Sequence, residues 1–384
     1  MTEFNRQLTL LDLPPYTPIP LRPYHYVPAL LNWPGEREAL RTAAKTTWDG
    51  MTPLIQVAPK GMAKRTEVAL STVKGWATQL DIALGSHPFY LDVLGISSDM
   101  PTRPASARSI LAHLYESARR RDLLFVPVCS SRDAIAVHAV REAAGVDRRG
   151  VAIRCRIGSS AFNLTPLAAE HGLSDLLTAL GVDPTEADLL LDYGYIGPDE
   201  DLTANDVMET LDEVAQVGAW RNTVLIATSV PSSFADEVPE GFVGGIARRE
   251  WELWESLRAL TDRRLSVGDY GVQHPRVPGT RSGGRMRANV RYPTEEGLLV
   301  GRGVGAFQDL SPQERSDQYR KICHDLVLNR LFVGRGCCPG DRTIQDCADG
   351  VLPPGSQSMW RFAGTAHDLR LAASDVQKWS RWHS

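Results

Sequence analysis

Acidic residues stand at the ends of several short aliphatic runs, where they could act on a bound substrate. Asp92, Asp192 and Asp269 each come late in such a run or directly after it. If the runs are parallel strands, their carboxyl ends meet at one opening, where carboxylates serve as general bases or metal ligands. Asp192 and Asp269 each begin an Asp-Tyr-Gly sequence, in which glycine permits an unusual backbone and tyrosine adds a hydroxyl and an aromatic face. We expect Asp192 and Asp269 to be catalytic, and Tyr193 and Tyr270 to contact the ligand.

A divalent metal ion is the cofactor that these carboxylates could share. Mg²⁺ and Mn²⁺ prefer oxygen ligands, so the predicted metal ligands are Asp92, Asp192 and Asp269. The alternative is that each carboxylate caps a helix or pairs with an arginine, as acidic residues at strand-to-helix turns commonly do. The sequence leaves both interpretations open and does not identify the metal.

Arginines form the second group of candidate residues. Of 42 basic residues only 6 are lysine, and the codon bias of a GC-rich genome accounts for such a ratio, so only placement carries weight. Arg154 and Arg156 alternate on a predicted strand and therefore share one face. Arg287 and Arg291 have the same parity on a predicted hairpin. Partly buried cations need an anionic partner. The residues expected to bind an anionic ligand are Arg154, Arg156, Arg249, Arg287, Arg291, Arg361 and His367.

The local charge supports this expectation, although it does not require it. Residues 245–305 hold 11 arginines and 7 acidic residues, within a chain whose formal charge is −4. Such a local surplus near barrel loops fits a phosphate or carboxylate ligand. The alternative is that these arginines lie on the surface or pair with the acidic residues named above.

Several familiar catalytic motifs do not occur. The stretch Gly301–Gly305 lacks the glycine order of a dinucleotide fingerprint, and neither a phosphate loop nor a Gly-x-Ser-x-Gly elbow is present. The adjacent Cys337 and Cys338 have no Cys-x-x-Cys spacing, so we interpret them as packing residues rather than zinc ligands.

The elements that position these residues are predicted by a regular alternation. Short β-branched or aliphatic runs alternate with stretches of helical spacing, which is typical of a parallel sheet with crossover helices. Eight such units indicate a TIM-like (β/α)8 barrel. The predicted strands are residues 26–31, 53–57, 89–94, 124–128, 151–157, 188–192, 223–228 and 265–268.

The domain organisation follows from the same pattern. Residues 1–23 are rich in proline and predict an extended arm. Residues 24–384 then form a single barrel domain. It carries an insertion at about 272–305, where a Gly- and Arg-rich loop precedes a predicted hairpin. Residues 229–245 are expected to form a long loop, and residues 337–358 an irregular segment.

Composition limits the function classes. The chain has 384 residues, of which 43% are hydrophobic and 23% charged, as in ordinary globular proteins. Its negative charge predicts no general attraction to nucleic acid or anionic membranes. It contains no apolar run of membrane-spanning length. The cysteines are scattered along the chain, and the N-terminal residues do not have the pattern of a signal peptide. Both observations favour a cytoplasmic protein.

Several stretches together resemble the phage and bacterial "beta protein" family over about residues 26–376. They include Gly35-Glu36, Gly268-Asp269-Tyr270 and Asn289-Val290-Arg291-Tyr292, followed by Trp360-Arg361 and His367. The resemblance implies a family found in phages and in bacterial gene clusters of mobile-element or defence type, without an established reaction. The sequence departs from the family pattern at Gln56, where glutamate is expected, and at Ala366, where histidine is expected.

Two functions from different classes remain open. The first is a cytoplasmic barrel that binds a phosphate-bearing ligand, a nucleotide or a nucleic-acid end. If it is an enzyme, it is a metal-dependent phosphoric-ester hydrolase in a phage or defence context. The alternative is a non-catalytic component of a phage or defence complex, with a partner protein from the same gene cluster. No membrane partner is expected.

Overall fold

The computed structural model describes residues 25–57, 66–93, 104–130, 134–157, 172–275 and 286–381. The arm expected over residues 1–23 lies outside these ranges, as does the middle of the expected insertion. Among the helices in these ranges, none has the length and apolar character required to cross a bilayer.

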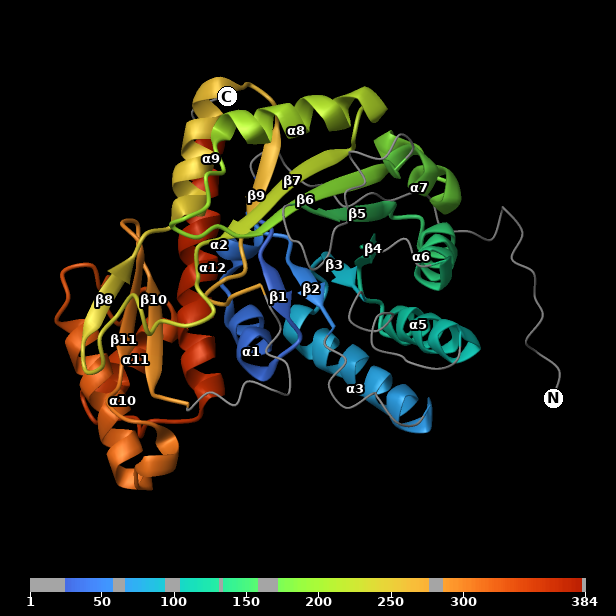
Figure 1. Ribbon diagram of the computed structural model, residues 1–384. Helices are drawn as coiled ribbons and strands as arrows, with labels where there is room; N and C mark the ends of the chain where they lie inside the picture. Colours follow the sequence, from blue (N-terminus) through green and yellow to red (C-terminus); the bar gives the residue numbers. More distant parts are fainter. Residues whose placement is uncertain are drawn as a thin grey trace.

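Eight parallel strands form the barrel (Figure 1), and each overlaps one of the predicted runs. In spatial order they are β1 (Ala29–Leu31), β2 (Leu54–Gln56), β3 (Phe89–Asp92), β4 (Phe125–Cys129), β5 (Val151–Arg156), β6 (Ala187–Tyr195), β7 (Asn222–Thr228) and β9 (Leu265–Gly268). The amide of Val27 donates to the carbonyl of Val267 at 2.8 Å, and that of Ala29 to the carbonyl of Asp269 at 2.7 Å. These bonds join β9 to the first strand, so the fold is a TIM-like (β/α)8 barrel.

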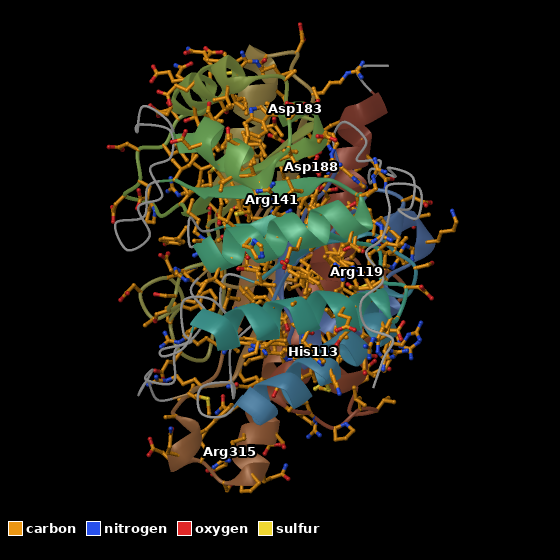
Figure 2. The ribbon with its side chains drawn as sticks, turned by 90° about the vertical axis from the view of Figure 1, so that its right-hand side faces the viewer. His113, Arg119, Arg141, Asp183, Asp188 and Arg315 are labelled. Atoms are coloured by element: carbon orange, nitrogen blue, oxygen red, sulfur yellow. The ribbon has the colours of Figure 1, made fainter. Side chains whose placement is uncertain are left out.

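Helices cover the outside of the barrel. Figure 2 looks onto two of them, with Arg119 and Arg141 labelled. Thr203 begins the helix that follows β6 with a capping box, in which its side chain accepts from the amide of Asp206. The helices of this layer are α1 (Pro34–Thr42), α2 (Lys45–Trp48), α3 (Thr66–Leu84), α5 (Pro104–Arg119), α6 (Ala134–Asp147), α7 (Gly172–Leu180), α8 (Ala204–Val217), α9 (Arg249–Leu260) and α12 (Gln357–Arg381), with a 3₁₀ turn at Pro184–Glu186.

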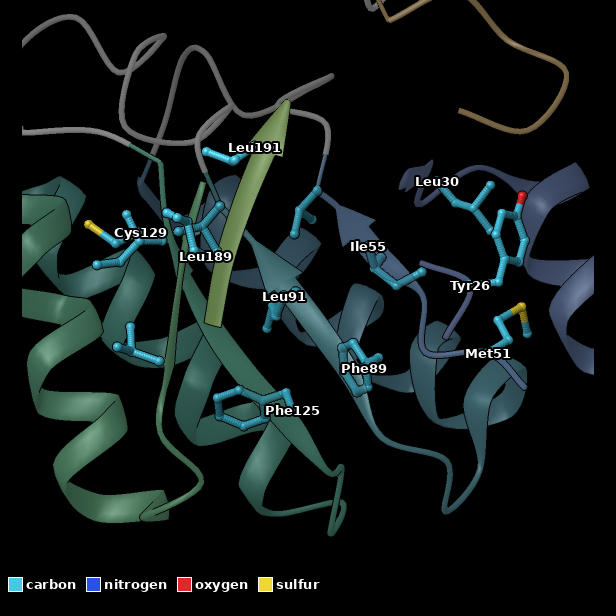
Figure 3. Close-up of a cluster of buried hydrophobic side chains, with 14 of the residues drawn as sticks. Tyr26, Leu30, Met51, Ile55, Phe89, Leu91, Phe125, Cys129, Leu189 and Leu191 are labelled. Atoms are coloured by element: carbon cyan, nitrogen blue, oxygen red, sulfur yellow. The ribbon is translucent and has the colours of Figure 1, made fainter. Parts of the chain in front are cut away.

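Two apolar layers follow from the alternation of side chains along each strand. The larger layer lies between strands and helices, and Figure 3 shows part of it, including Leu91, Phe125 and Leu189. The smaller layer fills the barrel interior with residues such as Tyr90 and Leu190. Several interior positions nearer the carboxyl ends of the strands are polar instead, and they form the floor of the site described below.

A second, smaller unit packs beside the barrel. Its three-stranded antiparallel sheet has the order β10 (Asn289–Pro293), β11 (Leu298–Arg302), β8 (Val243–Ile246). The predicted hairpin of the insertion corresponds to β10 and β11. The helices α10 (Pro312–Val327) and α11 (Pro339–Ala348) pack on this sheet, and a 3₁₀ turn covers Phe307–Asp309. Helix α12 runs between the unit and the barrel (Figure 1) and contacts both α1 and β10.

Two sequence expectations are wrong in this unit. Residues 243–245 are not loop but belong to the strand β8, whose two glycines weaken any local strand signal. This strand exists because it pairs with β11. Residues 339–348 are not irregular but the helix α11, which begins with Pro339 and has no side-chain cap. Its proline at the first helical position was the available signal.

Candidate functional site

A buried polar layer lies under the barrel mouth, and Arg154 is its centre. The side chain of Arg154 comes from β5 and is fully buried. Its Nε donates to Asp192 Oδ2 at 3.0 Å, and its Nη1 donates to Asp92 Oδ2 at 2.5 Å and to Gln56 Oε1 at 3.0 Å. Its Nη2 donates to the hydroxyl of Tyr270 at 2.8 Å and lies 2.8 Å from Asp192 Oδ2. The guanidinium group is therefore saturated by protein partners.

This saturation decides what Arg154 can do. Burial acts to lower the pKa of Arg154, but the neighbouring Tyr270, Asp192 and Asp92 outweigh it and hold the pKa well above its usual value. A permanently charged guanidinium then neutralises part of the charge of the two aspartates. Arg154 orders the floor of the mouth, and it has no free donor for a ligand.

The two Asp-Tyr-Gly sequences adopt the same turn but present opposite residues to the barrel. Gly194 and Gly271 both have positive φ, +68° and +57°. Their amides donate to the preceding aspartate in each case, at 3.0 Å and 2.8 Å. In the first sequence, Asp192 points into the barrel. In the second sequence, Tyr270 rather than Asp269 points into the barrel, because the two triplets differ by one residue in strand register. Tyr193 packs outward against the helices.

Asp269 consequently belongs to a different cluster. Its Oδ1 accepts from the Tyr26 hydroxyl at 2.6 Å, and Arg248 Nη2 lies 3.3 Å from Oδ2. Asp368 of α12 lies 3.0 Å from the same hydroxyl. A tyrosine hydroxyl carries one proton, so it can donate to only one of the two carboxylates, Asp269 or Asp368, at a time. Consistently, burial and the neighbouring Asp269 raise the pKa of Asp368 to about 8.

Above the polar layer, a small pocket opens with Glu36 in its wall. The pocket is lined by Ala29, Leu30, Leu31, Glu36, Gln56, Tyr270, Gln273, His274 and Pro275. Glu36 is 1% exposed, and neither of its carboxylate oxygens has a hydrogen-bond partner within the described residues. Burial raises the pKa of Glu36 to about 7, although Arg361, Arg291 and Arg37 partly offset the shift. The carboxyl group therefore titrates near neutral pH.

Two arginines stand next to Glu36. Arg361 Nε lies 3.6 Å from Glu36 Oε1, and its guanidinium stacks 4.4 Å above the ring of Trp33. Arg291 donates through Nη1 to the carbonyl of Val272 and, at 3.1 Å, to Gln273 Oε1. Burial and the charge of Arg361 lower the pKa of Arg291 to about 10. The guanidinium groups of Arg291 and Arg361 thus lie near the carboxyl group of Glu36, which is only about half ionised at neutral pH.

The structure brings some of the predicted residues together and separates others. Asp92, Asp192, Arg154 and Tyr270 meet under the mouth, and Arg156 lies 3.4 Å from Asp192 with 19% of its side chain exposed. Of the predicted residues, Tyr270 lines the pocket, and Arg291 and Arg361 lie near Glu36 in its wall. Arg249 opens α9, and its amide donates to Ser229 Oγ at 2.9 Å.

Three predicted ligand contacts lie elsewhere. Arg287 pairs with Glu240 at 2.8 Å, and Tyr193 faces the helical layer. His367 is buried against Asp341 and Tyr292 of the second unit. The predicted metal ligands are also divided, since Arg154 holds Asp92 and Asp192 whereas Arg248 holds Asp269. Of the described residues, only Cys337, Asp341 and His367 bring three such ligand atoms within 4.8 Å of one another.

Sequence reasoning missed Glu36 as a site residue. It lies in the first turn of α1, where glutamate is an ordinary helix-capping charge. Gly35 precedes it, and a Cβ at that position would lie 2.7 Å from the carbonyl oxygen of Ser358. This close packing of α1 on α12 is what buries Glu36. The Gly-Glu pair was one of the stretches that carried the family resemblance, and this was the available signal.

The fold and the site define a class, namely closed (β/α)8 barrels with a buried arginine–carboxylate layer under the mouth and a second antiparallel unit. The sequence profile of the Beta protein family matches residues 26–372, so the chain belongs to this family. No curated protein matches the chain. Among solved structures, 3-dehydroquinate dehydratase from Geobacillus kaustophilus HTA426 is similar, with 13% identity and a TM-score of 0.31, over 53% of this chain and 74% of that chain.

Proposed function

We propose that this protein binds a phosphate-bearing ligand, a nucleotide or a nucleic-acid end, at the barrel mouth. The observation that carries the proposal is that Arg291 and Arg361 lie close to Glu36, the carboxyl group that lines the pocket. With Glu36 ionised the three groups have a net charge of +1, and with Glu36 protonated +2. Buried cations in such excess favour an anion, and a phosphate group accepts several guanidinium hydrogen bonds at once.

Binding is better supported than metal-assisted hydrolysis. For Asp192 and Asp269 to hold Mg²⁺ or Mn²⁺ together, they would have to leave Arg154 and Arg248, and a buried cation without its partner is costly. If the site is catalytic, Glu36 is the better suited acid–base group, because a pKa near 7 allows it to donate or accept a proton at neutral pH.

A thermal-shift series tests the binding proposal. Nucleoside mono-, di- and triphosphates and short oligonucleotides are added with and without Mg²⁺ or Mn²⁺. A ligand that binds the native state at about 100 times its Kd stabilises it by about 2.7 kcal/mol, which is a shift of several degrees. We expect Arg361→Gln to lose the shift. The matched control is Arg287→Gln, whose guanidinium pairs with Glu240 away from the pocket, and which should retain it.

A second candidate function has one observation in its favour. Arg154, Arg287 and Arg291 all have protein partners, as expected if the protein is a non-catalytic component of a phage or defence complex in the cytoplasm. Under that proposal no phosphate-bearing compound shifts the melting temperature. The protein then co-purifies in a stable complex with the product of a neighbouring gene when the two are co-expressed.

A further inference from the structure

We propose that Cys337, Asp341 and His367 bind a zinc ion in the second unit, away from the barrel mouth. One ligand atom from each residue lies within 4.8 Å of the other two. Thiolate, imidazole and carboxylate are the three ligand types found in protein zinc sites. This donor set is too soft for Mg²⁺ and suits Zn²⁺ among the common divalent ions. The site is independent of the function proposed above.

Three separate elements hold the donors in place. Cys337 precedes α11, Asp341 lies in the first turn of α11, and His367 lies in the middle of α12. Gly340 allows this approach, because a Cβ there would lie 2.2 Å from the carbonyl oxygen of Ala363 on α12. Helices α11 and α12 therefore pack closely enough for the side chains of Asp341 and His367 to meet.

The spacing between the donors is close to that of a coordination shell. His367 Nδ1 lies 2.9 Å from Asp341 Oδ2. Two ligands bound at about 2.0 Å in a tetrahedral zinc site lie roughly 3.3 Å apart. A small shift of either side chain would thus admit the ion in place of the shared proton. The thiol of Cys337 would also lose its proton, because thiolate is the form that binds metal.

Neighbouring side chains form hydrogen bonds to the proposed ligands, as outer-shell groups do around a metal site. The hydroxyl of Tyr292 donates to Asp341 Oδ1 at 2.7 Å, and Cys338 Sγ donates to Oδ2 at 2.8 Å. Arg370 donates to Cys337 Sγ and places a positive charge beside it. Outer groups of this kind orient metal ligands and tune their basicity. Asp341 and His367 are buried, whereas Cys337 is partly exposed, so the ion could enter from the side of Cys337.

Hydrogen bonds already join His367 to Asp341 and Arg370 to Cys337. A bound ion would connect the segment before α11 to α12. We therefore expect zinc to stabilise the second unit rather than to take part in chemistry at the mouth.

Cobalt substitution of the full-length protein tests the site directly. The metal-free protein is titrated with Co²⁺ and then with Zn²⁺ as competitor. We expect one Co²⁺ per chain, with the near-ultraviolet charge-transfer absorption that thiolate–cobalt bonds produce, and its loss when Zn²⁺ is added. Cys337→Ser should abolish this absorption. His367→Gln should weaken Zn²⁺ binding by more than about a hundredfold, since loss of an outer-shell partner alone costs about 10- to 100-fold.

The matched control is His324→Gln, because His324 has 62% of its side chain exposed and lies outside the group. It should bind both metals as the wild type does. If His367→Gln fails to fold, Cys337→Ser decides the question, because the exchange of sulfur for oxygen preserves size. The proposal is overturned if the folded wild type gives no thiolate–cobalt absorption, or if Cys337→Ser retains it.

Discussion

At the scale of single residues, Arg154 and Glu36 have opposite roles in the same mouth. Arg154 is buried with all its donors occupied, so its contribution is to hold Asp92, Asp192 and Tyr270 in one arrangement. Glu36 is buried with both oxygens free of hydrogen bonds in the described part of the chain. A saturated group rigidifies a site, whereas an unsatisfied buried group remains available for a ligand.

Replacing Arg154 should therefore reduce stability more than it alters binding. Arg154→Met leaves two buried carboxylates without their counter-charge, and breaking a buried ion pair in this way costs about 3–5 kcal/mol. Urea unfolding measures this loss. The control Arg156→Met removes a partly exposed partner of the same Asp192 and should cost less than about 1 kcal/mol. Equal losses in the two variants would show that Arg154 is not the centre of the layer.

Glu36 should make stability depend on pH. Its folded pKa of about 7 exceeds the unfolded value near 4.3. The folded state thus holds the proton longer, and its stability falls as pH rises from about 4.5 to about 7, by on the order of 3 kcal/mol in total. Glu36→Gln should remove this decline. The free energies of unfolding of both proteins are compared across that range, and parallel curves would contradict the assignment.

The same titration should couple to the ligand. Protonation of Glu36 leaves Arg291 and Arg361 without an ionised carboxylate between them, so an anion should bind more tightly at about pH 6 than at about pH 8. Calorimetric titration with the nucleotide that gives the largest thermal shift measures this difference. Affinity in Glu36→Gln should hardly change with pH beyond the titration of the phosphate itself. If the affinity of Glu36→Gln depends on pH as strongly as that of the wild type, the proton that controls binding lies on another group.

Residue roles were only partly predictable from the sequence. Strand alternation placed Arg154 and Arg156 on one face correctly. It could not show whether Asp269 or Tyr270 faces the interior, because this depends on the register of β9 against β7. Glu36 was missed because its burial depends on α12, which comes far later in the chain than α1. Asp368 was missed because its environment depends on Tyr26, at the other end of the chain.

At the scale of elements, the contact between α1 and α12 positions the mouth residues. A Cβ at Gly35 would lie 2.7 Å from the carbonyl oxygen of Ser358 on α12, so Gly35→Ala should push the helices apart and cost about 1–3 kcal/mol, as overpacking usually does. It should also weaken ligand binding, because Glu36 and Arg361 lie on the two helices. Urea unfolding and calorimetry give the two measurements.

A second glycine in a helix provides the control. Gly75 lies in α3, and a Cβ there would meet nothing within 4 Å. Gly75→Ala should stabilise the protein by about 0.5–1 kcal/mol through helix propensity. A similar effect of both substitutions would mean that the approach at Gly35 is not tight.

Elements with strong local signals were predicted well. All eight barrel strands occur where the pattern places them. The strand β8 was missed because a Val-Gly-Gly-Ile segment has little strand propensity by itself. Only its partner β11, more than 50 residues later, gives it that conformation.

At the scale of the whole molecule, the ring depends on the seam between its first and last strands. Gly268 lies at this seam, where a Cβ would be 2.0 Å from the carbonyl oxygen of Val27. Gly268→Ala should therefore cost at least about 3 kcal/mol, because backbone atoms cannot move aside without opening the barrel. The control Gly245→Ala lies on β8 with nothing within 4 Å of its Cβ. It should change unfolding free energy by less than about 0.5 kcal/mol.

The closed ring also explains why function cannot be derived from the fold alone. It brings the ends of eight strands to one opening, but the sequence after each strand decides what the opening binds. In this protein the second unit adds Arg291 from β10 to the mouth, and α12 adds Arg361. The proposed anion site therefore exists only when barrel and second unit are assembled.

A crystal structure of the full-length protein with the best-binding nucleotide tests this central claim most directly. We predict that a phosphate group lies between the guanidinium groups of Arg291 and Arg361, against the carboxyl of Glu36. An ordered nucleotide bound elsewhere on the molecule, with the pocket at Glu36 holding only water, would contradict it.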